Sequence, residues 1–143
     1  MAIVEGVAMW ASVTTPNTTY TPVYTVNLIV DEEVANDFRS RGFKVKDMDE
    51  GPALIIKRKV NNKDGSVNSA PKLLDRNKQP LNVSVGNGSK VRVQYKEWES
   101  TWNGTLYKGL DFQAMQVIDL VEYASPDGAE FEVVDGEDNG SEF

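Results

Sequence analysis

Cationic and aromatic side chains alternate with apolar ones in one stretch of this sequence, residues 90–99. The alternating residues are Lys90, Arg92, Gln94, Lys96 and Trp98. Because successive side chains of a β-strand point to opposite faces, a strand here would place all five on one face. The intervening Val91, Val93 and Tyr95 would fill a core. A row of cationic side chains followed by a tryptophan suits an unpaired nucleic acid, since phosphates bind the charges and an unstacked base covers the indole ring. An ordinary solvated strand face explains the pattern equally well.

A cluster of aromatic residues continues from the end of this stretch around the next turn. It comprises Trp98, Trp102 and Tyr107, beside Lys96 and Lys108. The intervening Asn103-Gly104 pair is a strong signal for a tight hairpin turn, and turns lie at the surface. The two tryptophans therefore cannot both be core residues. Exposed rings beside cations form a stacking platform worth ~1–3 kcal/mol per base. For one tryptophan, an aromatic pair that stabilises the hairpin is the alternative.

Further basic and aromatic residues extend these two groups. Lys57 and Lys59 lie on another predicted strand, next to Arg58. Basic residues of the long loop at 62–89 are interpreted as general electrostatic contributors. Trp10 and Tyr20 either extend the stacking platform or belong to the core. The predicted nucleic-acid contacts are Trp98, Trp102, Tyr107, Lys90, Arg92, Lys96, Lys108, Lys57, Lys59, Trp10 and Tyr20.

The sequence offers few groups for catalysis. It contains no histidine and no cysteine, which removes the usual general base, the usual zinc ligands and thiol nucleophiles. The close acid pairs before residue 109 are at 47–50 and 97–99, and neither supplies the converging ligands of a two-metal nuclease. A phosphate-cradling Gly-x-x-x-x-Gly-Lys motif is absent. The sequence therefore predicts a non-enzymatic protein without a cofactor or a metal; a small nuclease is the disfavoured alternative.

Charge is divided unevenly along the chain. Residues 109–143 contain ten acids and no base, whereas residues 1–108 carry 12 acids and all 15 Lys and Arg. The net charge of −7 is therefore the sum of +3 for residues 1–108 and −10 for residues 109–143. The basic part at residues 1–108 can bind a polyanion although the pI of the whole chain is near 4.6. The acidic part at residues 109–143 can compete with that polyanion for the basic surface, or recruit a partner. We expect a domain over 1–124 and a flexible acidic tail over 125–143. A tail that only maintains solubility is the alternative.

Membrane and secretion signals are not recognisable in the sequence. No apolar run approaches the ~20 residues of a membrane helix, and the first residues lack the basic and apolar regions of a signal peptide. We therefore expect a cytosolic protein that does not bind membranes.

Period-two patterns predict about five strands. They cover residues 7–13, 20–30, 53–61, 90–99 and 106–123. In the last of these, one face is expected to carry Leu110, Phe112, Ala114, Gln116, Ile118 and Leu120, and the other Met115, Val117 and Val121.

One helix is predicted over residues 32–41. Asp31 is its N-cap and Gly42 its left-handed stop, while Val34 and Phe38 lie one turn apart and would pack on a sheet. The predicted fold is therefore all-β with one short helix, an OB-fold-like small β-barrel followed by an acidic tail. The usual OB helix lies between the third and fourth strands, so either this helix is an insertion or the strand count is off by one.

Four segments in a characteristic order resemble a known family. They are the aromatic strand around Trp10, the segment Tyr24-Thr25-Val26-Asn27-Leu28 with the helix after it, the stretch from Lys108 to Val117, and the acidic end with Phe143. Together they resemble the phage single-stranded DNA-binding proteins of OB-fold type. The resemblance implies a protein that coats exposed strands during DNA replication, recombination and repair in the infected cell. It also implies that the tail binds replication or recombination proteins, through Asp135, Glu137, Asp138, Glu142 and Phe143.

Two questions stay open from the sequence. A non-enzymatic structural or interaction protein would also explain a barrel with a charged tail, although not the alignment of cations with exposed rings. A homodimer is permitted by an edge strand or an exchanged tail, but nothing in the sequence requires it.

Overall fold

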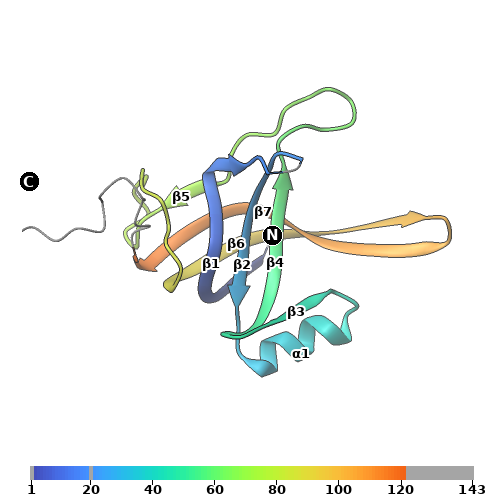
Figure 1. Ribbon diagram of the computed structural model, residues 1–143, viewed down its shortest axis with the longest axis horizontal. Helices are drawn as coiled ribbons and strands as arrows, with labels where there is room; N and C mark the ends of the chain where they lie inside the picture. Colours follow the sequence, from blue (N-terminus) through green and yellow to red (C-terminus); the bar gives the residue numbers. More distant parts are fainter. Residues whose placement is uncertain (1, 20, 122–143) are drawn as a thin grey trace, which may run out of the picture.

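The strands of this protein are long and the helix is short, as the computed structural model in Figure 1 shows for residues 2–19 and 21–121. The elements are β1 (Ala2–Asn17), β2 (Val23–Ile29), α1 (Glu32–Ser40), β3 (Val45–Met48), β4 (Gly51–Lys59), β5 (Lys72–Leu74), β6 (Ser89–Trp102) and β7 (Thr105–Asp119). Tyr20, the predicted boundary at residue 124 and the predicted tail contacts lie outside the described residues.

Five strands close into a barrel. The sheet order is β3-β4-β2-β1-β6-β7-β5, and an additional parallel pairing of β4 with β7 joins its two sides. The closed ring is therefore β1-β2-β4-β7-β6, with β3 and β5 attached outside it. This confirms the predicted all-β fold with one short helix and an OB-fold-like small barrel.

The barrel interior is filled by the alternating positions that the sequence indicated. On β2, Tyr24, Val26 and Leu28 are buried and their neighbours are half-exposed. On β6, the buried residues are Val91, Val93 and Tyr95, and the alternate residues Lys90, Arg92 and Lys96 are exposed. Period-two alternation survives here because each strand has one face on the core and one toward solvent.

The predicted faces of the last strand were wrong beyond Phe112. Gln94 pairs with Ala114 and Tyr95 with Phe112, so β7 has one residue more than β6 at this point. This bulge at Gln113 reverses which residues point inward. As a result the buried residues are Leu110 and Phe112 before the bulge, and Met115 and Val117 after it.

Another bulge lies in β1, which is longer than the predicted residues 7–13. Met9 pairs with Asn27 and Ser12 with Thr25, so one residue of β1 is extra. Trp10 occupies this bulge with a φ of 52°, an uncommon conformation for a non-glycine residue. Its backbone N–H donates to Asn87 Oδ1 at 2.7 Å. The bulge aims the Trp10 side chain outward, and it is 62% exposed.

Helix α1 forms where the sequence predicted it and ends one residue earlier, at Ser40. The Asp31 carboxylate accepts from the Val34 N–H at 2.9 Å, and Gly42 has a φ of 91°. Ala35 and Phe38 are buried against the barrel. The helix lies between β2 and β3, although five strands close the ring, so it is an insertion relative to the usual OB position. No helix in the described ranges is long and apolar enough to cross a membrane.

Two short strands were missed. β3 pairs with β4 as a small hairpin, and β5, inside the predicted long loop, pairs in parallel with β7. Segments of three and four residues carry too few alternations for a periodic signal, so they were not predicted.

Candidate nucleic-acid interface

The β6–β7 hairpin projects far from the barrel (Figure 1). Its pairing runs without interruption from Lys96↔Asp111 at the barrel to Trp102↔Thr105 at the tip. Asn103 and Gly104 close it with φ angles of 50° and 78°, which is the geometry of a two-residue type I′ turn. The predicted hairpin is confirmed, and it places its side chains beyond the barrel surface.

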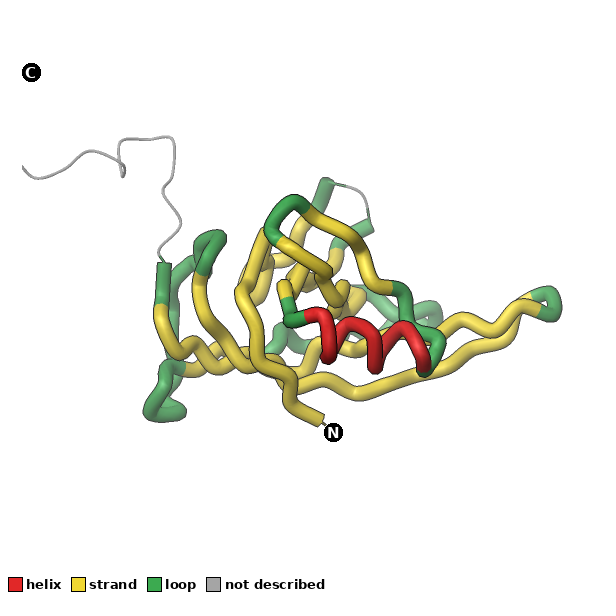
Figure 2. Tube along the Cα trace, turned by 90° about the horizontal axis from the view of Figure 1, so that it is seen from below, coloured by secondary structure: helices red, strands yellow, loops and turns green. Residues whose placement is uncertain are grey.

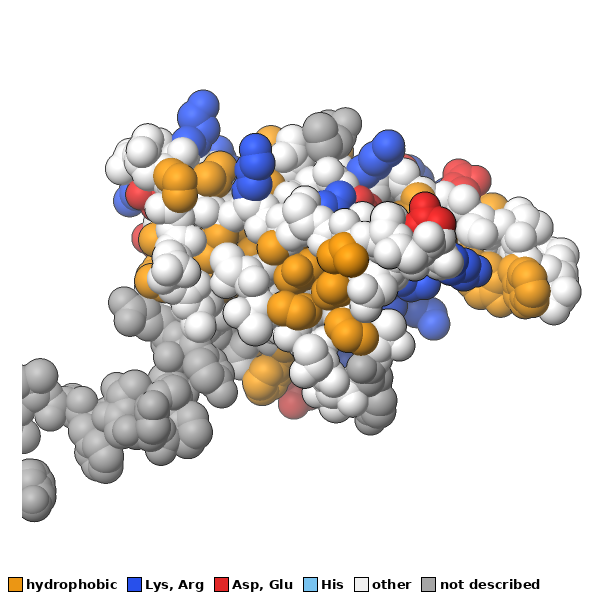
Figure 3. Space-filling view, turned by 90° about the horizontal axis from the view of Figure 1, so that it is seen from above, with side chains coloured by type: hydrophobic (Ala, Val, Ile, Leu, Met, Phe, Trp, Pro, Cys, Tyr) orange, Lys and Arg blue, Asp and Glu red, His pale blue; other side chains and the backbone are white. Residues whose placement is uncertain are grey.

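One face of this hairpin carries all three rings. Trp98 pairs with Gly109, Ser100 with Tyr107, and Trp102 with Thr105, so these residues share one side of the ribbon. We call it the aromatic face, defined by Trp98, Trp102 and Tyr107. The rings are 44%, 67% and 49% exposed, respectively, which confirms that the tryptophans beside the turn are not core residues. In the space-filling view of Figure 3, hydrophobic and basic side chains lie together at the hairpin end.

Trp98 lies flat against the backbone at the foot of the hairpin. A Cβ atom built on Gly109 would come within 2.3 Å of Trp98 Cζ2, so glycine at this position leaves the space that the indole occupies. Trp98 also lines two surface hollows, of about 570 and 430 Å³. The ring is therefore held in place and remains accessible.

A series of paired residues on neighbouring strands leads from the barrel wall to the foot of the β6–β7 hairpin. Ser12 pairs with Thr25, Thr25 with Lys57, Lys57 with Asp111, and Asp111 with Lys96. These residues form one row around the wall of the barrel, with one residue on each of its five strands, and the path along the surface is about 19 Å at ~4.8 Å per step. We call it the cross-strand row. It ends at Lys96, two residues from Trp98.

Three predicted cations gather around this row. Lys57, Lys59 and Lys96 line the 430 Å³ hollow together with Trp98 and the side chains of Asn62 and Asn68. With residues of the described ranges, none of the three lysines forms an ion pair. Their charges are thus available to an anionic ligand beside an exposed ring.

Lys90 and Arg92 lie elsewhere. Both pair with Glu5 of β1, at 3.7 and 3.1 Å, and Arg92 lines a separate hollow of about 180 Å³ with Ile3. Since eight residues of an extended strand span about 26 Å, Lys90 is far from Trp98 although both belong to the same alternating pattern. The structure therefore does not bring these two cations to the aromatic face.

Lys108 lines the 570 Å³ hollow with Lys57, Trp98 and Tyr107, but its charge is engaged within the protein, and Trp10 lies apart from the hairpin. The Lys108 side chain is 20% exposed, and its ammonium donates to the Arg41 carbonyl. Trp10 lines a groove of about 390 Å³ whose other side chains are uncharged, between β1 and residues 83–87. It contributes a separate exposed ring.

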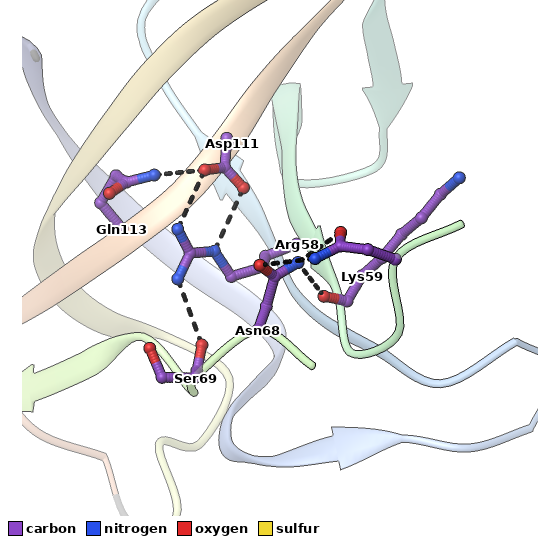
Figure 4. A network of polar contacts seen from close by, with 7 residues as sticks. Arg58, Lys59, Asn68, Ser69, Asp111 and Gln113 are labelled. Atoms are coloured by element: carbon purple, nitrogen blue, oxygen red, sulfur yellow. Dashed lines mark hydrogen bonds and ion pairs between the residues drawn. The ribbon is translucent and has the colours of Figure 1, made fainter. Parts of the chain in front are cut away.

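An ion pair that sequence reasoning missed joins β4 to β7 where the barrel closes (Figure 4). Arg58 Nη2 contacts Asp111 Oδ2 at 3.2 Å, and Arg58 Nη1 donates to the Ser69 carbonyl at 3.2 Å. Gln113 donates to the same carboxylate. Asp111 therefore places one negative charge in the cross-strand row. The partners are 53 residues apart in sequence, and no local pattern signals such a contact.

Comparisons with known proteins found similarity at the level of structure. No family model matches the sequence, and no curated protein matches it. The chain is similar to gp2.5, a single-stranded DNA-binding protein encoded by bacteriophage T7, with a TM-score of 0.64, 16% identity, and 98% and 99% of the two chains covered.

A second similar structure is a single-stranded DNA-binding protein from bacteriophage Enc34, with a TM-score of 0.59, 11% identity, and 90% of this chain and 87% of that chain covered. The same Enc34 protein in complex with single-stranded DNA gives a TM-score of 0.56 at 10% identity, over 84% and 88% of the chains. This chain therefore has the fold of single-stranded DNA-binding proteins of bacteriophages.

Proposed function

We propose that this protein binds single-stranded DNA without base preference and coats exposed strands. It does so during phage replication, recombination and repair, in the cytoplasm of an infected cell and without catalysing a reaction. The observation that carries the proposal is the aromatic face of the hairpin standing beside Lys57, Lys59 and Lys96. The neighbours of the same fold support it, since their names describe single-stranded DNA binding.

Two physical contributions would supply affinity. Bases stack on Trp98, Trp102 and Tyr107 at ~1–3 kcal/mol each, in a sequence-tolerant way because every base has a π-face. Lys57 and Lys96 neutralise phosphates along the cross-strand row and release the counterions of those phosphates into solution, with a slope of roughly −0.7 in log K against log salt per phosphate. Stacking is insensitive to salt by comparison, so the two contributions can be measured separately.

Removing the rings tests the stacking contribution. In a titration with poly-dT, the wild-type protein should show quenched tryptophan fluorescence and should bind double-stranded DNA more weakly. Trp98→Ala and Trp102→Ala should each weaken binding at least about fivefold. Leu106→Ala is the matched control, because Leu106 is 55% exposed on the opposite face of the same hairpin. Absence of any quench at low salt would contradict the proposal and favour a structural or interaction protein.

The acidic end is proposed to bind partner proteins and to compete with DNA. Asp135, Glu137, Asp138, Glu142 and Phe143 belong to the ten-acid stretch at 109–143, which can act as an internal polyanion for the cationic surface. Deleting residues 136–143 should therefore tighten DNA binding most at low salt. Weaker binding of the truncated protein would refute the competition.

A further inference from the structure

The C-terminal end of α1 contacts the face of the hairpin opposite the aromatic face. Figure 2 shows α1 running alongside the foot of the hairpin. Glu97 pairs with Leu110, and Glu99 with Lys108, so these residues share the other side of the ribbon. We call it the helix-side face, defined by Glu97, Glu99 and Lys108.

Arg41, the C-cap of α1, makes the first connection. Its Nη1 donates to Glu97 Oε2 at 2.7 Å, and its guanidinium lies 4.6 Å above the Phe38 ring centroid. Phe38 in turn packs against Tyr95 of β6, with ring centroids 5.9 Å apart. The hydrogen bond to Glu97 raises the pKa of Arg41 above its ordinary value. Arg41 is thus held between the core and the hairpin.

Lys108 makes the second connection, from β7. Its ammonium donates to the Arg41 backbone carbonyl, where a cation also complements the helix dipole. The same ammonium lies 4.8 Å above the Phe43 ring centroid and 3.9 Å from Glu99. A Cβ atom on Gly42 would come within 3.3 Å of Lys108 Cδ, so the α1–β3 connection is closely fitted to the lysine stem.

We propose that the C-terminal end of α1 is a brace that fixes the angle of the β6–β7 hairpin to the barrel, with Arg41, Glu97 and Lys108 as its positioning residues. A two-stranded ribbon that extends from a domain is marginally stable alone. Ordering it on binding costs affinity, and fixing it beforehand reduces that cost. The brace holds both strands, β6 through Glu97 and β7 through Lys108, on the side away from the rings.

This inference gives Lys108 a different role from the phosphate contact expected for it, and its effect on DNA binding rests on the proposed function. A phosphate contact contributes to the salt slope, whereas a brace contributes to hairpin order with or without DNA. The two roles therefore differ in measurable quantities.

The experiment uses the full chain with Lys108→Met, which retains the apolar stem and removes the donor, and with Glu97→Gln. Nitrogen-15 relaxation of the indole N–H groups without DNA should show a clear loss of order for Trp98 and Trp102, and none for Trp10. Affinity for a dT oligonucleotide should fall about three- to tenfold with an unchanged salt slope. Glu33→Gln, an exposed charge at the opposite end of α1, should change neither quantity.

Two results would overturn the brace. Unchanged indole order in both variants would show that the hairpin needs no support from α1. A slope reduced by roughly 0.7 in Lys108→Met would assign Lys108 to a phosphate instead. Lys108→Arg, which keeps a donor for the carbonyl, should retain most of the order and affinity; a loss as large as that of Lys108→Met would contradict the role of this hydrogen bond. Because indole order is measured without DNA, the brace is tested even if the proposed function fails.

Discussion

Neutralising Lys96 is the sharpest test of the cross-strand row. Lys96 is exposed, lies at the end of the row two residues from Trp98, and lines the same hollow as Lys57. If it neutralises one phosphate, Lys96→Gln should reduce the slope of log K against log salt by roughly 0.7. Extrapolated between 1 M and 0.1 M salt, that slope corresponds to about fivefold in affinity, or ~1 kcal/mol. The effect should therefore be small at high salt and grow as salt is lowered.

The assay is fluorescence anisotropy of a labelled dT oligonucleotide at salt concentrations from about 0.05 to 0.5 M. A label on the DNA avoids any direct effect of residue 96 on the Trp98 indole. Arg76→Gln is the control, because it removes one exposed positive charge from the turn after β5, at the end of the barrel away from the hairpin (Figure 1).

Both variants remove one positive charge, so their DNA affinities should differ only if Lys96 contacts a phosphate directly. Arg76→Gln should change affinity by less than twofold and leave the slope within error of the wild-type value. Equal effects of both substitutions at every salt concentration would mean that net charge alone governs binding, and the reasoning from the row would be refuted. An unchanged slope in Lys96→Gln would remove Lys96 from the phosphate contacts.

Three further substitutions test particular contacts. Gly109→Ala should displace the Trp98 indole, because the new Cβ would lie 2.3 Å from the ring; dT affinity should fall by up to ~1–3 kcal/mol, and wild-type affinity would contradict the stacking role. Asp111→Asn should tighten DNA binding at low salt, because it removes the one acid from the cross-strand row. Loss of the ion pair with Arg58 should at the same time lower the free energy of unfolding by about 1–2 kcal/mol. Weaker DNA binding in a titration of the folded variant would contradict the electrostatic role of Asp111. Gly6→Ala should destabilise the fold by about 1–3 kcal/mol, because its Cβ would lie 2.3 Å from the Ile29 carbonyl oxygen; an unchanged melting temperature would count against the close approach of β1 and β2.

Local patterns predicted the parts of the interface that depend on single strands. The alternation at residues 90–98 set which side chains of β6 lie on one face, since the opposite face of that strand packs on the core as far as Tyr95. The Asn103-Gly104 pair predicted the turn, and the turn required exposed neighbours such as Trp102. Each of these inferences needs only a few adjacent residues.

Bulges limited how far such patterns could be followed. One extra residue at Gln113 reverses the faces of β7, and the left-handed conformation of Trp10 does the same in β1. Neither residue has the chemistry that usually marks a bulge, because neither is a glycine. The faces of these two long strands were therefore decided by their partners.

The sequence by itself determined the alternating faces, the capped helix, the tight hairpin turn and the separation of basic from acidic residues, because each follows from the type and spacing of nearby residues. Tertiary structure decided which cations stand beside the rings. It paired Lys90 and Arg92 with Glu5, engaged Lys108 at the end of α1, and aligned Lys57 with Lys96 across β7. Such neighbours arise from strand register and barrel closure between segments far apart in the chain, and a charge acts on whatever lies within a few ångströms of it.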